Sequence, residues 1–130
     1  MQTVKIAASA LVAFAVLDGV WLGLVMKGFY RSQLAPIARM ADDGLAPIWP
    51  AAILVYVLLA VGVTAFVIPR AVDTASAAGL GALLGLVVYG VYDLTNYATL
   101  TEYPLALTLV DICWGTVATA VASAVVRAIS

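Results

Sequence analysis

The chain has 130 residues, a net charge of -1 and a mean hydropathy of +1.14, with 65% hydrophobic and only 10% charged residues. Soluble domains carry about 25% charged residues, so this composition excludes an ordinary soluble protein and indicates a membrane protein. Six basic side chains against seven acidic ones give no positive field for a nucleic acid, which excludes that class of partner.

Four apolar segments are each long enough to form a transmembrane helix. A helix rises about 1.5 Å per residue, so about 20 residues cross the hydrocarbon core of a bilayer. One membrane domain over residues 1–130 therefore accounts for the whole chain. We predict an all-α membrane protein, an antiparallel bundle of four transmembrane helices. The predicted spans cover about residues 4–26, 47–68, 74–100 and 104–126.

Prolines and charged residues mark the predicted span boundaries. Lys27 follows the first span, Pro47 suits the start of the second, and Pro104 restarts the chain before the fourth. The connections at residues 69–73 and 101–103 are very short. Short connections predict that the second and third spans pack side by side, and that the third and fourth do so as well.

The longer connection, residues 27–46, has room for an interfacial loop. Its apolar and aromatic side chains are predicted to lie along the membrane surface, where amphipathic rings are favoured. Tyr103, near a span end, is predicted to be a similar anchor at the level of the headgroups. The predicted surface residues of the loop are Phe29, Tyr30, Leu34 and Ile37.

Basic residues do not decide the orientation, because three fall on each side of a four-span arrangement. Acidic residues gather on the side of the long loop and contribute little to the rule. From this small bias we expect both termini in the cytoplasm.

Three aspartates lie inside the predicted spans, and this is the most informative feature of the sequence. Asp18, Asp93 and Asp111 each lie seven or eight residues from the same membrane face. That spacing puts all three at a depth of roughly 10 to 12 Å. A carboxylate in hydrocarbon costs roughly 2.5 to 3.5 kcal/mol on insertion scales, so such acids usually face a bundle interior and mark a site.

Polar and aromatic residues share the helix faces of these aspartates. Residues three or four apart lie on one face of a helix, and two of the spans carry the pattern D-x-x-W. Tyr56 lies at a similar depth in the second span, so every span contributes to one layer. The predicted site consists of Asp18, Trp21, Tyr56, Tyr89, Asp93, Asn96, Asp111 and Trp114.

The sequence is compatible with a structural role of these residues and with a site for a proton or a cation. Buried polar groups can simply hold a bundle in register, each contact contributing about 0.6 kcal/mol on average. Clustered acids repel one another when ionised, which favours a retained proton or a bound cation. A metal here would be a hard, oxygen-ligated cation held by Asp18, Asp93 and Asp111. The chain has no histidine, a lone Cys113 and no phosphate-binding loop, so it lacks a haem, zinc or nucleotide signature.

Small residues recur at spacings that allow helices to approach closely. Gly19 and Gly23 form one G-x-x-x-G pattern, and Gly81 and Gly85 form another. We interpret both as packing surfaces. Such surfaces also suit a homo-oligomer. We expect one because the four helices of a single chain are too few to enclose a narrow pore.

Four stretches of the sequence resemble a known family. They are LDGVWLG at residues 17–23, FY at 29–30, YGVYDLTNYATL at 89–100 and VDICWGT at 110–116. Together they resemble the domain of unknown function 2177 family over nearly the whole chain. The resemblance implies a small multi-pass protein of the bacterial inner membrane, with no established activity. Fatty-acid-modifying enzymes are often encoded near members of this family, which implies a link to lipid chemistry.

Three hypotheses for the function remain. In the first, the aspartate layer binds or moves a small solute, a cation or a proton. In the second, the protein is an intramembrane enzyme, in which one carboxyl acts as general acid and another as base on a membrane lipid. In the third, it is a helper subunit for lipid-modifying enzymes, and the aspartates matter only for stability.

Overall fold

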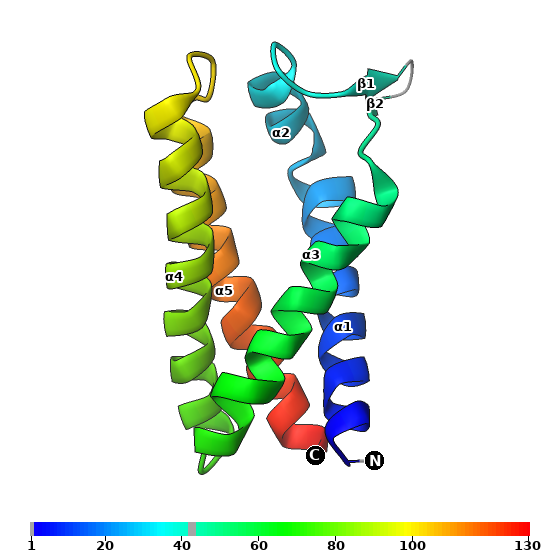
Figure 1. Cartoon of the computed structure of the whole chain (residues 1–130), viewed down its shortest axis with the longest axis vertical. Coiled ribbons are helices and arrows are strands. Elements are labelled where there is room, and N and C mark those ends of the chain that lie inside the picture. Colours follow the sequence, from blue (N-terminus) through cyan, green and yellow to red (C-terminus); the bar gives the residue numbers. More distant parts are fainter. Residues whose placement is uncertain (1, 42–43) are drawn as a thin grey trace.

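The computed structural model describes residues 2–41 and 44–130, and four long helices dominate it (Figure 1). All four are long and apolar enough to cross a membrane, so the predicted helical membrane bundle is confirmed. The first runs through α1 (Gln2–Val20) and a π-helical turn η1 (Trp21–Val25). The second consists of α3 (Trp49–Gly62), a π turn η2 (Val63–Val67) and a 3-10 turn η3 (Ile68–Arg70), and the others are α4 (Thr74–Thr99) and α5 (Leu105–Ile129).

The connections place both termini at one end of the bundle and the long loop at the other (Figure 1). That loop contains a short helix, α2 (Lys27–Leu34), followed by two short strands. The strands, β1 (Met40–Ala41) and β2 (Gly44–Leu45), pair antiparallel. Residues 42–43 of the predicted interfacial loop lie outside the described residues. The helix α2 has eight residues, whereas only an interfacial loop was expected in this part of the chain.

A seam of small residues joins α4 to α5. A Cβ atom added at Gly85 would overlap the carbonyl oxygen of Gly115 and lie 2.9 Å from the Thr119 side chain. One added at Gly81 would lie 2.6 Å from the carbonyl oxygen of Thr119. The two backbones can approach this closely only because no side chain separates them. This confirms the packing role of one G-x-x-x-G pattern, whereas at Gly19 and Gly23 such an atom would meet nothing within 4 Å among the described residues.

Replacing Gly85 by alanine is expected to destabilise the protein by about 1 to 3 kcal/mol, because the helices must move apart. Gly79 is a matched control on the same helix, since a Cβ there meets nothing within 4 Å. Gly79→Ala should be neutral, or stabilising by up to about 1 kcal/mol through helix propensity. Unfolding of both variants in mixed micelles measures the difference. Equal stability of the two would contradict the seam.

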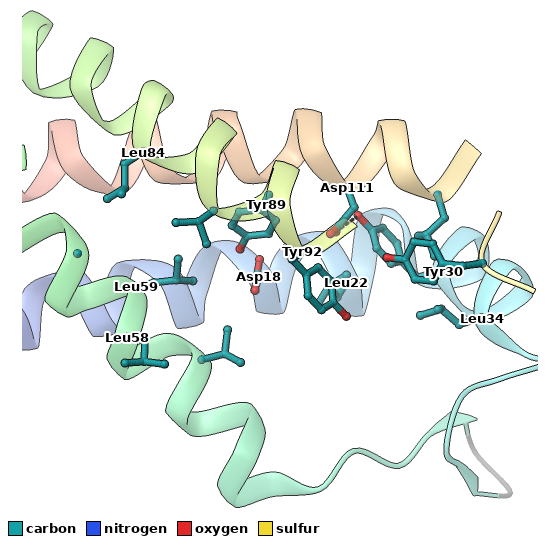
Figure 2. Close-up of a pocket in the computed structure, with 15 residues that line it drawn as sticks. Asp18, Leu22, Tyr30, Leu34, Leu58, Leu59, Leu84, Tyr89, Tyr92 and Asp111 are labelled. Atoms are coloured by element: carbon teal, nitrogen blue, oxygen red, sulfur yellow. Dashed lines mark hydrogen bonds between the residues drawn. The ribbon is translucent and has the colours of Figure 1, made fainter. Parts of the chain in front are cut away.

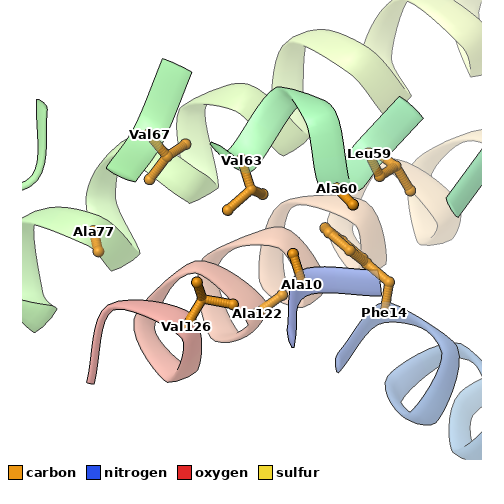
Figure 3. Packing of buried hydrophobic residues seen from close by; sticks show 9 residues of the cluster. All are labelled: Ala10, Phe14, Leu59, Ala60, Val63, Val67, Ala77, Ala122 and Val126. Carbon is orange, nitrogen blue, oxygen red and sulfur yellow. The ribbon is translucent and has the colours of Figure 1, made fainter. Parts of the chain in front are cut away.

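The apolar core lies toward the end of the bundle that carries the termini. Figure 3 shows Phe14 of α1 with Val63 and Val67 of η2 and with Ala122 and Val126 of α5. Phe14, Val63 and Val126 are fully buried. All four spans therefore meet around the second half of the α3–η2 helix.

Toward the other end of the bundle, α3 leans on α1 and away from α4 (Figure 1). Contact between the second and third spans is concentrated in η2, where the short turn joins them. The prediction that these spans pack side by side is therefore wrong for most of α3. Since α4 is tied closely to α5, the lean of α3 leaves space between α3 and α4.

The turn between the second and third spans is fixed by a capping box. The Ser76 backbone N–H donates to Asp73 Oδ1 at 2.7 Å, and the Asp73 N–H donates to Ser76 Oγ at 3.0 Å. These bonds lower the pKa of Asp73, chiefly through the backbone donor of Ser76. Arg127 near the end of α5 donates to the Val72 carbonyl at 3.3 Å, so this turn is also held to the C-terminal helix.

Candidate functional site

A cavity of about 550 Å³ occupies the space where α3 and α4 diverge. Its walls near the core are apolar, as the side chains of Leu58, Leu59 and Leu84 show at one side of Figure 2. Toward α2 the lining becomes polar and includes Asp18 and Asp111 (Figure 2). The remaining lining residues are Leu22, Tyr30, Leu34, Val55, Gly62, Val88, Tyr89, Tyr92, Tyr103 and Leu107.

Asp18 lies on α1 and is only 9% exposed. The indole N–H of Trp114, on α5, donates to its Oδ1 at 2.7 Å. The Tyr56 hydroxyl of α3 is also close to this carboxyl group. The predicted contribution of the second span to the aspartate layer is thus present, although Tyr56 does not line the cavity itself.

Asp111, on α5, is held by a chain of two hydrogen bonds. The Tyr30 hydroxyl of α2 donates to Asp111 Oδ1 at 2.9 Å. The Trp21 indole N–H donates in turn to the Tyr30 oxygen at 3.1 Å. The π turn η1 ends with a hydrogen bond from the Met26 N–H to the Trp21 carbonyl (2.7 Å), and α2, which carries Tyr30, begins at the next residue. Short π segments occur frequently at functional sites.

The two D-x-x-W patterns interlock across the helices. Each aspartate was predicted to share a face with its own tryptophan, but the partners are exchanged: Trp114 donates to Asp18, and Trp21 reaches Asp111 through Tyr30. The rings of Trp21 and Trp114 stack between them, with centroids 4.4 Å apart and planes 4° from parallel. This arrangement ties α1 to α5 at the depth of the aspartate layer.

Asp93, on α4, is fully buried. The Tyr103 hydroxyl donates to its Oδ1 at 2.5 Å, while Oδ2 accepts no hydrogen bond from the described residues. The carboxyl groups of Asp93 and Asp111 are close enough to share a hydrogen bond when one of them holds a proton. Asp93 does not line the cavity and lies behind Asp111 and Tyr103, which do.

Tyr89 and Asn96 have different positions on α4. The ring of Tyr89 lies directly over Gly115, where a Cβ atom would overlap it, and it lines the cavity. Asn96 lies one turn beyond Asp93, close to Tyr92 and Tyr103 and outside the cavity lining. The structure therefore brings Tyr89 into the candidate site and leaves Asn96 at its edge.

Two tyrosines that the sequence assigned to the membrane surface are part of this site. Tyr30 is 5% exposed and Tyr103 is 7% exposed, and both pack on Leu107. The prediction that they are surface anchors is wrong, because both side chains are buried and each hydroxyl donates to an aspartate, Tyr30 to the partly buried Asp111 and Tyr103 to the buried Asp93. In the sequence, only their position indicated this role. Each tyrosine lies near the end of a span, at a distance from which its hydroxyl can contact the aspartate layer.

Burial keeps these two hydroxyl groups protonated. It raises the pKa of Tyr30 and of Tyr103, and the negative charge of Asp111 and Asp93, respectively, raises the pKa further. At neutral pH both phenols are therefore hydrogen-bond donors. They serve as fixed donors to the aspartates.

The three aspartates do not converge on a single metal site. Within residues 2–41 and 44–130, no group of three acidic or cysteine side chains could hold a metal ion. The predicted hard-cation site of Asp18, Asp93 and Asp111 is therefore corrected. Asp18 turns toward Trp114, whereas Asp93 and Asp111 turn toward tyrosines.

Comparison with known proteins identifies one relationship. No curated protein and no solved structure matches the chain. A family model described as predicted membrane protein (DUF2177) matches residues 3–128. That match covers all but the first residue of the first span and the last residue of the fourth, and every residue of the candidate site, so the chain belongs to the DUF2177 family of predicted membrane proteins.

Proposed function

We propose that this multi-pass membrane protein binds an amphipathic molecule taken from the surrounding bilayer. The observation that carries the proposal is the cavity of about 550 Å³, which has apolar walls at one end and aspartates and tyrosines at the other. Ligand sites commonly have volumes of roughly 300 to 1,000 Å³ and place a few polar groups in an apolar lining. An apolar chain would lie along Leu58 and Leu84, with its polar group at Asp18 and Asp111.

The arrangement of the helices supports entry from the side. The cavity lies where α3 departs from α4, and its wall residues Leu58 and Tyr92 remain 67% and 58% exposed. A surface of this kind, turned toward hydrocarbon, is in contact with lipid chains. A molecule dissolved in the bilayer can therefore reach the polar end without crossing water.

This proposal makes the first hypothesis more specific, because the solute is an amphipathic molecule. The site then serves for binding and is neither a pore nor an ion pathway. A specific observation also favours the enzyme alternative: the Asp93 and Asp111 carboxyl groups lie close together, with Asp93 Oδ2 buried and unpartnered among the described residues. Such a pair can hold one proton, which a general acid or base needs. If the protein is instead a helper subunit, the cavity is not a ligand site, so filling it does not change the binding of an amphipathic molecule.

A tryptophan at position 88 tests the proposal. Val88 lines the cavity, whereas Val91, on the same helix, is 66% exposed and lies outside the lining. Val88→Trp should reduce photo-crosslinking of a long-chain, diazirine-bearing alcohol at Leu58 by about tenfold or more, since the ring fills the site and the binding energy is lost. Val91→Trp is the matched control and should leave the labelling unchanged. Equal labelling of Leu58 in both variants would refute the cavity as a binding site.

We place the protein in a bacterial inner membrane with both termini in the cytoplasm. Helical spans support an inner membrane over an outer one, where spanning proteins are β-barrels. The termini share one end of the bundle (Figure 1), and the acidic residues of the loop side support the orientation. Reporter fusions at the C-terminus test it.

A further inference from the structure

The polar end of the cavity offers mainly hydrogen-bond acceptors. A carboxylate has about four acceptor sites. Asp18 Oδ1 accepts from Trp114, and Asp111 Oδ1 accepts from Tyr30. Both carboxyl groups line the cavity, so acceptor sites that these bonds leave open can face a ligand.

The donors of this layer are already engaged with protein acceptors. Trp114 and Tyr30 donate to the aspartates, Trp21 donates to Tyr30, and Tyr103 donates to Asp93. Of the cavity tyrosines, only Tyr89 and Tyr92 keep hydroxyl groups without such a bond among the described residues. A ligand that needs more donors than the hydroxyl groups of Tyr89 and Tyr92 would have to break the bonds that hold the layer together.

The cavity also lacks positive charge. Among the described residues, those that line it include no lysine or arginine, and the chain has no histidine. Asp93 adds a third carboxyl group directly behind Asp111, with a buried oxygen that lacks a partner among residues 2–41 and 44–130. An anionic headgroup would therefore find no cation to pair with, in a medium that screens charge poorly.

We propose that the ligand presents a hydrogen-bond donor that is not anionic, a hydroxyl or a primary amine, on a long apolar chain. Carboxylate, sulfonate and phosphate headgroups are rejected. This inference rests on the proposed function, because it specifies which amphipathic molecule occupies the cavity. Its physical basis is the excess of acceptors over donors, which leaves a ligand without donors unable to satisfy the carboxyl groups of Asp18 and Asp111.

Four photoactivatable probes with the same diazirine-bearing alkyl chain test the selection in bilayer nanodiscs. Their headgroups are a primary alcohol, a primary amine, a methyl ether without a donor, and a sulfonate. Labelling of Leu58 and Leu84 is divided by labelling of the lipid-facing Val91, which corrects for partitioning into the bilayer. The alcohol and the amine should exceed the ether and the sulfonate by about tenfold or more.

An aspartate variant separates charge from hydrogen bonding. Asp111→Asn keeps an acceptor but loses the negative charge, so labelling by the amine should fall about tenfold while labelling by the alcohol changes by no more than about twofold. Asp18→Asn serves the same purpose if the first variant does not fold.

The outcomes separate the two proposals. Equal labelling by all four probes would overturn the headgroup selection and leave the proposed binding function standing. Preferential labelling by the sulfonate would also overturn the selection. If no probe labels the cavity above Val91, the proposed function itself fails, and the selection fails with it.

Discussion

Replacing Tyr103 by phenylalanine is expected to lower the free energy of unfolding by about 2 kcal/mol, because it leaves a buried carboxyl group without a donor. Asp93 is fully buried and its Oδ2 already lacks a partner among the described residues, so within that part of the chain the hydrogen bond from Tyr103 is what satisfies its carboxyl group. Reversible unfolding in mixed micelles measures the loss.

Two comparisons make this prediction specific. Tyr97 is 44% exposed on the same helix as Asp93, and Tyr97→Phe should change stability by less than about 0.5 kcal/mol. In an Asp93→Leu background the acceptor is absent, so Tyr103→Phe should cost much less than in the wild type. The same cost in both backgrounds would show that Tyr103 acts through its packing on Leu107 and not through the hydroxyl.

Replacing Trp114 by phenylalanine is expected to cost about 3 kcal/mol, because two interactions are lost together. The indole N–H no longer donates to Asp18, and the smaller phenyl ring stacks on Trp21 over less of its area. Since two indoles 4.4 Å apart couple optically, the variant should also lose an exciton signal in circular dichroism.

Trp49 provides the control for this variant. It is 65% exposed and stands at the start of α3, far from the stacked pair in sequence. Trp49→Phe should leave both stability and the exciton signal in place. A signal that survives Trp114→Phe, or one that disappears with Trp49→Phe, would contradict the stacked geometry.

The sequence predicted the four spans well, for a physical reason. Hydrocarbon requires continuous apolar helices of a known length, so the hydropathy of the chain and a rise of about 1.5 Å per residue determine where the spans lie. The same count of residues placed Asp18 and Asp111 at one level of the bundle, and both line one cavity. Tyr89 joins them for the same reason.

The partners of these residues were not predictable in the same way. The spacing D-x-x-W shows that Asp18 and Trp21 share a face of one helix, but it does not show which residues of another helix that face meets. The exchange of tryptophans, the inward turn of Tyr30 and the lean of α3 all depend on contacts distant in sequence: Asp18 and Trp114 are 96 positions apart. Periodicity within one span carries no information on such pairs.

Because the cavity opens between α3 and α4, its occupancy depends on the concentration of the ligand in the membrane and not on its concentration in water. A ligand that arrives through the bilayer moves by diffusion in two dimensions, and the relevant concentration is its mole fraction among the lipids. An apparent dissociation constant measured against total ligand in water would then shift with the amount of lipid in the sample. Titrations at several protein-to-lipid ratios should collapse onto one curve only when the ligand is expressed per lipid.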